Sequence, residues 1–414
     1  MKVSKKRFDP VDKRQKIMRH AAGQFLRHGY EGCTMDLVAA KAKVGKQAIY
    51  EFFESKEHLF AEVTRARLAE FRIPAPRREL PAREAIERYL IETVDKAADP
   101  TASGLLRLNI LIFRQHPALA AELHDGRRRG ASELAAYLVS LGEGEYASLR
   151  GIDPLNFATR MAGVATEGVR HFLGIPWQGE EERQASARFS VRHFFDGCPC
   201  DGGQPDLSAH SHGPLSPVRP YAVTRLPESR FDELCVKALA GFLDHGFDGM
   251  SLDLLVAETG VSRATIYRQF GNKDGLFRYV LGREIDRRAA VTWLTPRASD
   301  FTSELEALAA DVLAEHLSSP SIAMYRLLIR EVKRVPDLAV AYYDSQIDRL
   351  REPLFDIFAR HRNIRPCEGC VRAFHTLATF GVRFLTSPAS LDSAGIAQLS
   401  RETARIMDRP IAVD

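Results

Sequence analysis

The chain has 414 residues, a formal net charge of +4, and 27% charged and 45% hydrophobic residues. This composition is ordinary for a water-soluble protein, and the length allows two or more domains. No run of about 18 apolar residues occurs, so no transmembrane helix is expected, and the basic N-terminus is not followed by the apolar segment of a signal peptide. Six cysteines in a chain this long do not form a disulfide framework, so we expect a cytoplasmic protein.

A basic arm opens the chain. It contains Lys2, Lys5, Lys6 and Arg7. These residues could lie on phosphates or in a minor groove of DNA, or they could form a disordered tail. The sequence leaves both alternatives open.

A duplication organises the rest of the chain. Residues 17–63 align without a gap with residues 234–280, at a fixed offset of 242 − 25 = 217 that brings Phe25 onto Phe242. Both copies share apolar, aromatic and glycine positions, and fainter repeats continue downstream. A period this long indicates a duplicated domain rather than a solenoid.

The second copy shows the local structure most clearly. Ser251 is predicted to cap a first helix, Gly260 to end it in a left-handed turn, and Ser262 to cap a second helix over 263–270. Two short helices joined in this way predict a helix-turn-helix unit, whose second helix enters the DNA major groove. In the first copy Lys43 replaces the turn glycine, at a cost of about 1 kcal/mol.

Long helices are predicted after each of these units. The patterning is helical over 81–98, 104–115, 118–141, 154–174 and 180–195, and again over 301–317, 322–335, 337–361, 368–385 and 393–408. Residues 197–227 are rich in Pro, Gly, Ser and His and read as a linker. We therefore divide the chain into a first head (1–72), a first body (73–196), the linker (197–227), a second head (228–290) and a second body (291–414).

The heads resemble the TetR/AcrR family of bacterial regulators. The resemblance rests on VGKQAIYEFF at 44–53 and VSRATIYRQF at 261–270, each followed by the start of a fourth helix, SKEHLF or NKDGLF. It implies an all-α fold of two tandem units, each a three-helix DNA-binding head and a helical ligand-binding and dimerisation body. A usual member has one of each and works as a homodimer. Two of each imply a covalent pseudo-dimer joined through the last two long helices of each body, with recognition helices about 34–36 Å apart.

The resemblance also assigns DNA contacts. Phosphate contacts are implied for Tyr50, Tyr267, Lys56 and Lys273, and for the hydroxyls of Thr34 and Ser251, which serve equally well as helix caps. Base readout is expected from Lys46, Gln47 and Ala48 in the first head and from Arg263, Ala264 and Thr265 in the second.

The two heads are predicted to read unlike half-sites. Residues 1–72 carry 16 Lys and Arg against 9 Asp and Glu (16 − 9 = +7), whereas residues 221–290 carry ten of each (10 − 10 = 0). Glu51 stands opposite Arg268, and it could accept a hydrogen bond from a cytosine amine or simply face solvent. We therefore expect an imperfectly palindromic operator.

Polar residues on the apolar helices of the bodies are the candidate ligand-pocket residues, although each is also an ordinary choice for a satisfied core or interface group. They are Arg107, Thr166, Arg170, His171, Arg326, His375, Thr379 and Arg383. Trp177 and Trp293 fit a pocket or simple packing.

Two cysteine clusters suggest a competing sensor class. Cys367 and Cys370 form a C-x-x-C motif, and Cys198, Cys200, His210 and His212 lie together in the linker. The linker spacing is not a familiar zinc signature, so we interpret both clusters as coincidental and expect no metal and no cofactor.

No catalytic motif occurs, so the protein is not expected to be an enzyme. We predict a cytoplasmic transcriptional repressor that binds double-stranded operator DNA and is released by an unknown small molecule, with no membrane partner. A redox- or metal-responsive regulator is one alternative. Another is that one head has lost DNA binding and contacts proteins, and pairing of halves between two chains also stays open.

Overall fold

The computed structural model describes residues 10–70, 73–113, 115–141, 151–198, 226–295, 297–379, 385 and 391–408. Every regular element within these ranges is helical, which confirms the all-α prediction. No helix in the described part of the chain is both long enough and apolar enough to cross a membrane. The basic arm, most of the linker and Arg383 lie outside the described residues.

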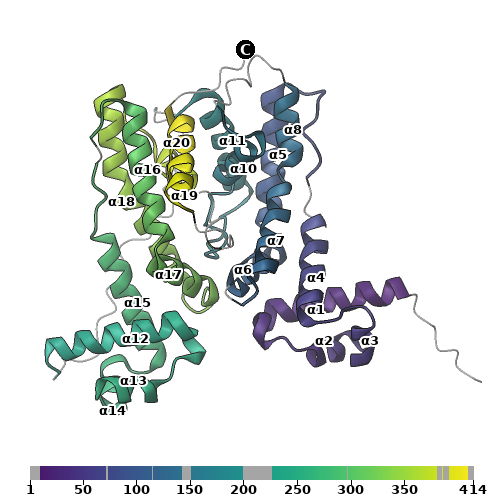
Figure 1. Ribbon diagram of the computed structural model, residues 1–414, viewed down its shortest axis with the longest axis vertical. Coiled ribbons are helices and arrows are strands. Elements are labelled where there is room, and N and C mark those ends of the chain that lie inside the picture. The colour runs from purple at the N-terminus through teal and green to yellow at the C-terminus, as the bar shows by residue number, and fades with distance from the viewer. Residues whose placement is uncertain are drawn as a thin grey trace, which may run out of the picture.

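Each head consists of four consecutive helices. The first head contains α1 (Pro10–Gly32), α2 (Met35–Ala42), α3 (Lys46–Tyr50) and α4 (Lys56–Glu70). The second head contains α12 (Glu228–Gly249), α13 (Leu252–Thr259), α14 (Arg263–Phe270) and α15 (Lys273–Ala289). In both heads the fourth helix extends toward the body that follows it in the sequence (Figure 1).

The bodies are built from longer helices. The first body contains α5 (Ala82–Ala97), α6 (Pro100–Ile112), α7 (Pro117–Arg129), α8 (Ser132–Ser140), α10 (Pro154–Ala165) and α11 (Glu180–Asp196). The second body contains α16 (Phe301–Leu317), α17 (Ser319–Arg330), α18 (Pro336–Arg362), α19 (Glu368–Thr379) and α20 (Ser393–Asp408).

Several helix boundaries follow directly from the sequence. The carboxylate of Asp99 accepts hydrogen bonds from the amides of Thr101 and Ala102, and Pro100 occupies the first turn of α6, where a missing N–H costs nothing. Asp153 caps α10 in the same way, with Pro154 in its first turn. Because these caps fix the start of a helix, α6 begins four residues before the predicted position at residue 104.

Two long predicted helices are wrong in extent. The segment 118–141 forms α7 and α8, which are separated at Gly130, whose carbonyl accepts a hydrogen bond from the Tyr89 hydroxyl at 3.2 Å. The segment 154–174 is helical only to Ala165, because Glu167 and Gly168 adopt left-handed backbone conformations with φ of 50° and 56°. A Cβ on Gly168 would lie 3.0 Å from the Thr376 methyl group, so this turn also allows a close approach between the two bodies.

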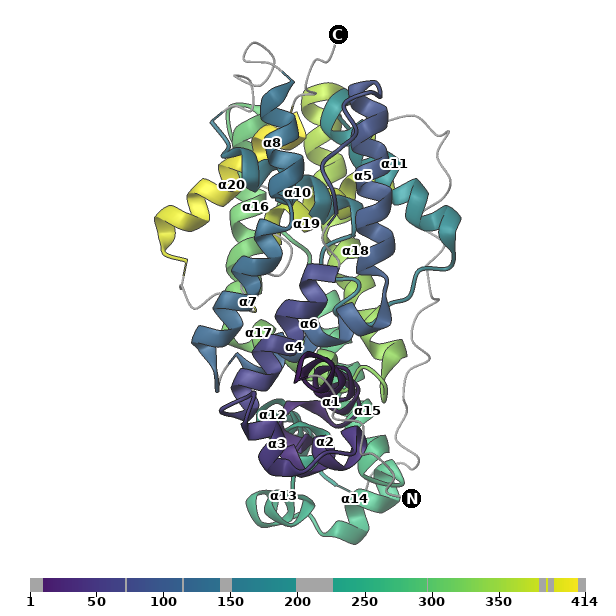
Figure 2. The same cartoon turned by 90° about the vertical axis from the view of Figure 1, so that its right-hand side faces the viewer.

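The two heads lie at one end of the molecule and the bodies at the other, as both views show (Figures 1 and 2). Between the outer helices of the bodies lie α10, α11, α19 and α20 (Figure 1). There Arg160 of α10 is buried and donates hydrogen bonds to the carbonyl of Leu377 at 2.9 Å and to the carboxylate of Glu402 at 2.9 Å. The two halves therefore contact each other within one chain.

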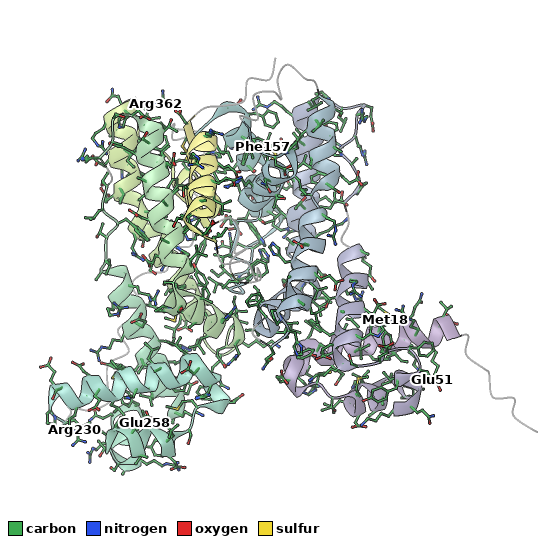
Figure 3. All side chains as sticks on the ribbon, in the orientation of Figure 1. Met18, Glu51, Phe157, Arg230, Glu258 and Arg362 are labelled. Atoms are coloured by element: carbon green, nitrogen blue, oxygen red, sulfur yellow. A yellow bond between two sulfur atoms is a disulfide. The ribbon has the colours of Figure 1, made fainter. Side chains whose placement is uncertain are left out.

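The hydrophobic cores of the two heads are connected to the bodies differently. The core of the first head, with Phe25 and Phe53 at its centre, forms a cluster with residues of α6 and α7 such as Leu105 and Leu123. The core of the second head belongs to the same cluster as the cores of both bodies. Side chains fill the interior of both heads and both bodies (Figure 3).

Candidate DNA-binding faces and the junction between the halves

In the first head, α2 and α3 form a helix-turn-helix around an unusual turn. The Thr34 hydroxyl caps α2 by accepting the amide of Leu37 at 3.2 Å. Lys43 follows this helix with φ of 52° and ψ of 49°, and thus adopts the left-handed conformation that the sequence predicts for it. Gly45 precedes α3 and offers no side-chain cap, and α3 has only five residues. The second helix of this unit therefore starts without a local capping bond.

In the second head, the equivalent unit has the expected local signals. The Ser251 hydroxyl accepts the amide of Leu254 at 3.3 Å, and Gly260 ends α13 with φ of 65°. Ser262 then caps α14 by accepting the amide of Thr265 at 3.2 Å. Capping supplies a partner for an amide that the helix itself leaves unpaired. The eight residues of α14 thus start from a defined position.

The residues expected to read bases lie on corresponding faces of the two heads. Lys46, Gln47, Arg263 and Ala264 are exposed, and Ala48 and Thr265 are half-buried. The Ile49 and Ile266 side chains point the other way and are fully buried. Because Ile anchors one side of each short helix, the opposite side faces out of the head at the end of the molecule away from the bodies (Figure 1).

The tyrosines assigned to phosphate are also exposed. The exposed fraction is 46% for Tyr50 and 40% for Tyr267. Both side chains can thus be reached by a partner. Their hydroxyls are suited to donate a hydrogen bond to a phosphate oxygen.

In each head, an ion pair joins the candidate base-reading cation to the preceding helix of the helix-turn-helix, α2 or α13. The Lys46 ammonium lies 2.8 Å from the Asp36 carboxylate, and the Arg263 guanidinium lies 2.6 Å from Asp253. The hydrogen bond and charge of Asp36 raise the pKa of Lys46. These pairs occupy equivalent positions (36 + 217 = 253 and 46 + 217 = 263). Both are exposed, so they cost little to exchange for a base or a phosphate.

The helix-four lysines also occupy equivalent positions. Lys56 donates a hydrogen bond to the carbonyl of Tyr30 at 3.1 Å and lies 4.3 Å from the centre of its ring. Lys273 donates to the carbonyl of Asp248 at 3.4 Å and lies 5.0 Å from the centre of the Phe247 ring. Both ammonium groups are therefore held against the end of the first helix of their head.

Glu51 and Arg268 differ between otherwise matching positions. Glu51 is exposed and forms an ion pair with Lys13 of α1 at 3.3 Å, and its place on the first head is labelled in Figure 3. Arg268 is also exposed on α14. The two faces thus carry opposite charges at this position.

The pocket candidates of the first body have partners within the protein. The buried Arg170 guanidinium contacts Glu167 at 3.1 Å and Glu182 at 2.9 Å, and it lies 4.2 Å from the centre of a Trp177 ring. Burial opposes the charge of Arg170, but the two carboxylates together raise its pKa. This arginine therefore behaves as a satisfied interior group.

The other first-body candidates also have local partners. The hydroxyl of Thr166 donates to the carbonyl of Ala162 in its own helix at 2.9 Å. Arg107 donates to the carbonyl of His171 at 3.3 Å, and burial lowers the pKa of Arg107. Arg107 and His171 are thus brought together by the structure.

The second body brings together two predicted residues and one that sequence reasoning missed. The Nε2 atoms of His375 and His316 lie 3.3 Å apart, and the hydroxyl of Thr379 donates to the carbonyl of His375 at 2.8 Å. Burial lowers the pKa of His316 to about 4 and also lowers that of His375, so both imidazoles are neutral near pH 7. Arg326 lies elsewhere, with its guanidinium 5.2 Å from the centre of the Phe113 ring of the first body.

A buried charge cluster across the two halves was also missed. Glu167 pairs with Arg170 of its own half and lies 3.6 Å from Arg372 and 3.5 Å from the Tyr343 hydroxyl of the second half. Its left-handed backbone places it at this junction. A single polar residue on an irregular turn gives no periodic signal in the sequence.

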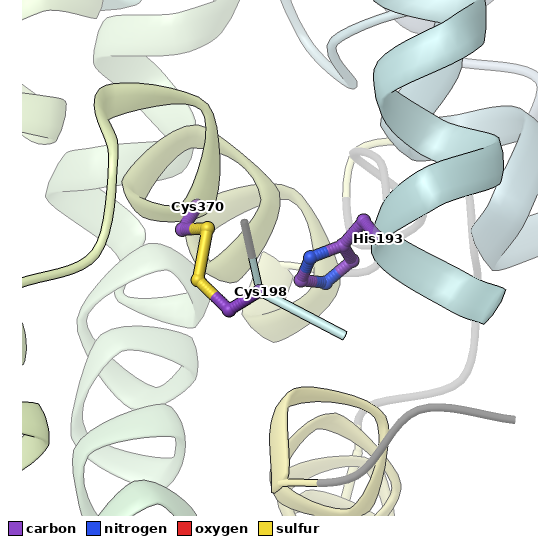
Figure 4. A group of neighbouring side chains, drawn as sticks. All are labelled: His193, Cys198 and Cys370. Carbon is purple, nitrogen blue, oxygen red and sulfur yellow. A yellow bond between two sulfur atoms is a disulfide. The ribbon is translucent and has the colours of Figure 1, made fainter. Parts of the chain in front are cut away.

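The cysteines differ from the sequence-based expectation. Cys198 and Cys370, assigned to separate clusters, form a disulfide that joins the end of the first half to the second half. The imidazole of His193 faces this bond (Figure 4), and Cys367 lies 3.6 Å from Cys370 between sulfur atoms. Cys200, His210 and His212 lie outside the described residues.

Comparison with known proteins identifies the two heads. Residues 17–63 and 235–280 each match the family of bacterial regulatory proteins described as the tetR family. The chain is 38% identical over 88 residues to the protein named uncharacterized HTH-type transcriptional regulator YhgD of Bacillus subtilis, which is 20% of this chain and 46% of YhgD. It is 52% identical over 54 residues to the HTH-type transcriptional repressor ComR of Escherichia coli, which is 13% of this chain and 26% of ComR. The chain thus spans less than half the length of these curated relatives.

Some solved structures are similar to part of the chain. A flavonoid-responsive regulator, FrrA, is 22% identical with a TM-score of 0.37, and the match covers 44% of this chain and 93% of FrrA. A TetR-family regulator from Mesorhizobium loti is 21% identical with a TM-score of 0.36, covering 44% of this chain and 95% of that one.

Proposed function

We propose that this chain is a cytoplasmic transcriptional repressor that binds one operator with both heads. Two separate segments of the chain match the tetR family of bacterial regulatory proteins. The observation that carries this proposal is the placement of two matching faces, with Tyr50 and Tyr267 exposed, at the same end of one molecule (Figure 1). One covalent chain would then do the work of a homodimer. The tetR family consists of regulators, and an enzymatic role is not proposed.

The contacts between the halves support a pseudo-dimer within one chain. Arg160 of the first body is buried and bonded to the carbonyls of Leu377 and Leu399 and to the Glu402 carboxylate of the second. Removing a buried charge from its partners costs several kcal/mol, so separating the halves would expose or strand this group. We therefore place one chain, rather than two, on each operator.

The two faces favour unlike half-sites. In the first head Lys46 is suited to guanine and Gln47 to adenine, while in the second head Arg263 is suited to guanine and Ala264 and Thr265 to the thymine methyl group. Tyr50, Tyr267, Lys56 and Lys273 are assigned to phosphates, which fix register without reading sequence. The operator is then an imperfect palindrome.

Release is proposed to follow from a small molecule that binds a body. A ligand releases DNA only if it has a higher affinity for the conformation that does not bind DNA than for the conformation that does. The second head has direct links to its body for such a shift, since the amide of Phe247 donates to Glu331 at 3.1 Å and Arg278 forms a bidentate pair with Asp337. The residues proposed for ligand contact are the same as those expected from the sequence: Arg107, Thr166, Arg170, His171, Arg326, His375, Thr379 and Arg383.

The first test is native mass spectrometry with DNA from upstream of the gene for this protein. One 46.3 kDa chain per duplex is expected. Tyr50→Phe and Tyr267→Phe should each lower affinity about tenfold or more, because a hydrogen bond to a charged group contributes about 1.5–3 kcal/mol. Tyr137→Phe, in α8 of the first body, is the matched control and should leave affinity unchanged.

Other results would change the proposal in defined ways. Two chains per duplex would mean that halves pair between molecules or that two pseudo-dimers share an operator. A silent Tyr50→Phe or Tyr267→Phe variant would identify a head that has become a protein-contact module. Absence of any complex at low salt would contradict the repressor function itself.

Redox control is the second candidate, because the Cys198–Cys370 disulfide joins the two halves. Under this alternative, a peroxide would accept two electrons and two protons from the thiols and change operator affinity. Affinity that is the same before and after oxidation, with the disulfide verified by mass spectrometry, would exclude this candidate.

A further inference from the structure

Three side chains with metal-binding chemistry, His193, Cys198 and Cys370, converge where the two halves meet, and a fourth, Cys367, lies beside Cys370. His193 lies on α11, and Cys198 follows the end of that helix. Cys367 precedes α19, and Cys370 lies in its first turn. Each half thus contributes two groups, and neither half alone holds the set.

The distances are those of a compact ligand set. The ligand atoms of His193, Cys198 and Cys370 all lie within 4.8 Å of one another. The sulfur of Cys367 lies 3.6 Å from that of Cys370. Two thiolates on one tetrahedral zinc ion, each about 2.3 Å from the metal, are about 3.8 Å apart. Cys367 and Cys370 therefore already stand at the separation that such an ion requires.

His193 provides an independent sign of a missing ligand. Its side chain is fully buried between the rings of Phe189 and Phe194, each about 5.7 Å away between ring centres. Neither ring nitrogen has a hydrogen-bond partner within the described part of the chain. Burying an unsatisfied polar group costs about 1–3 kcal/mol. The ring nevertheless faces the sulfur atoms (Figure 4), as an imidazole ligand would.

We propose that His193, Cys198, Cys367 and Cys370 form a closed metal site for Zn²⁺ in the reduced protein. Three thiolates and one imidazole are a structural zinc set, and soft sulfur ligands favour this ion over Mg²⁺ or Ca²⁺. The bound ion satisfies the buried imidazole. It also joins α11 of the first half to α19 of the second, so the site holds the two bodies together whether or not the heads bind DNA.

The disulfide and the metal complex are alternative states of the same sulfurs. A dithiol reductant converts the Cys198–Cys370 bond to two thiols and is itself oxidised to a disulfide. Zn²⁺ then displaces the protons of the three thiols, which pass to solvent. The metal stays Zn²⁺ throughout this step.

The test is zinc stoichiometry and affinity of the full chain. The protein is reduced, freed of metal with a chelator, incubated with Zn²⁺ alone and passed through a desalting column. Elemental analysis by inductively coupled plasma mass spectrometry should find one zinc ion per chain. With Co²⁺ in place of Zn²⁺, the visible absorption spectrum should be that of a tetrahedral cobalt site with sulfur ligands. His193→Leu and Cys367→Ser should each weaken zinc binding more than about a hundredfold. This loss exceeds the effect of removing a residue that only hydrogen-bonds to a metal ligand.

Matched controls separate ligand loss from misfolding. Cys33→Ala and Cys235→Ala remove buried free thiols from the two heads and should retain one zinc. Cys367 is only half-buried, so Cys367→Ser tests the site with little disturbance of the core, and circular dichroism verifies its helix content. Reduced wild-type protein that retains no zinc would overturn the proposal. So would one zinc per chain that survives both ligand substitutions.

Discussion

The two heads build the same helix-turn-helix from different local energetics. In the second, Gly260 supplies the left-handed turn with φ of 65° and Ser262 caps a recognition helix of eight residues. In the first, Lys43 adopts a left-handed conformation with φ of 52°, and Gly45 starts a helix of five residues without a side-chain cap. Ile49 and Phe53 of the first head are as deeply buried as Ile266 and Phe270 of the second, so the packing of the recognition helix is the same in both heads. Tertiary packing thus imposes a turn that the local sequence of the first head disfavours.

The heads also differ in their attachment. The first is joined to its body by an exposed pair between Arg65 and Glu122 at 2.6 Å and by a buried core that it shares with α6 and α7. The second is joined by Arg278 to Asp337 and by a core that continues into both bodies. The core of the second head is therefore continuous with both bodies, whereas the core of the first head is shared only with α6 and α7 of its own body.

The largest predicted effect comes from the head cores. Phe53→Ala and Phe270→Ala should each destabilise their head by about 3–5 kcal/mol, because both rings are buried and leave a cavity. Hydrogen exchange should accelerate in the first head with α6 and α7 for Phe53→Ala, and in the second head and both bodies for Phe270→Ala. If each substitution accelerated hydrogen exchange only in its own head, the two heads would not differ in how they are attached to the bodies.

The base-reading cations come next. Lys46→Ala and Arg263→Ala should each cost about 1–3 kcal/mol of operator binding and relax sequence preference only in their own half-site. Binding to a library of operator variants measures this. Lys41→Ala and Lys237→Ala, exposed lysines of α2 and α12, serve as controls. Loss of preference in both half-sites from one substitution would contradict independent reading.

The turns give a smaller and opposite pair of effects. Gly260→Ala should destabilise the second head by about 1–2 kcal/mol, since a Cβ is disfavoured in a left-handed turn, whereas Lys43→Gly should stabilise the first by about 1 kcal/mol. Urea unfolding measures both. Gly282→Ala in α15 is the control, because an added Cβ meets nothing within 4 Å and should stabilise the helix. Two changes of the same sign would show that the turns are not equivalent.

Helix capping gives the smallest effect. Gly45→Ser should stabilise the first head by a few tenths of a kcal/mol, and Ser262→Gly should destabilise the second by a similar amount. The backbone of Gly45, with φ of −69° and ψ of 148°, already suits a serine cap. Thermal unfolding of paired variants measures the difference. A destabilised Gly45→Ser variant would indicate that the added hydroxyl lacks the expected amide partner.

The sequence by itself determined the helices and the repeat. Residues 263–270 and 301–317 were predicted with the bounds of α14 and α16, because caps and helical periodicity act between neighbours in the chain. Tyr50 and Tyr267 were singled out by the family resemblance of their motifs, and both side chains are exposed. These features depend on interactions within a few residues.

Only the tertiary structure decided what the body residues do. Arg170, predicted as a pocket residue, lies in a charge cluster with Glu167, and Arg160 meets Glu402, which is 242 positions away. Cys198 and Cys370, predicted to belong to unrelated clusters, are bonded beside His193. Such partners come from different halves of the chain, and no local pattern encodes which distant helix a buried polar side chain will meet. Packing of α10 and α11 against α19 and α20 settles that choice.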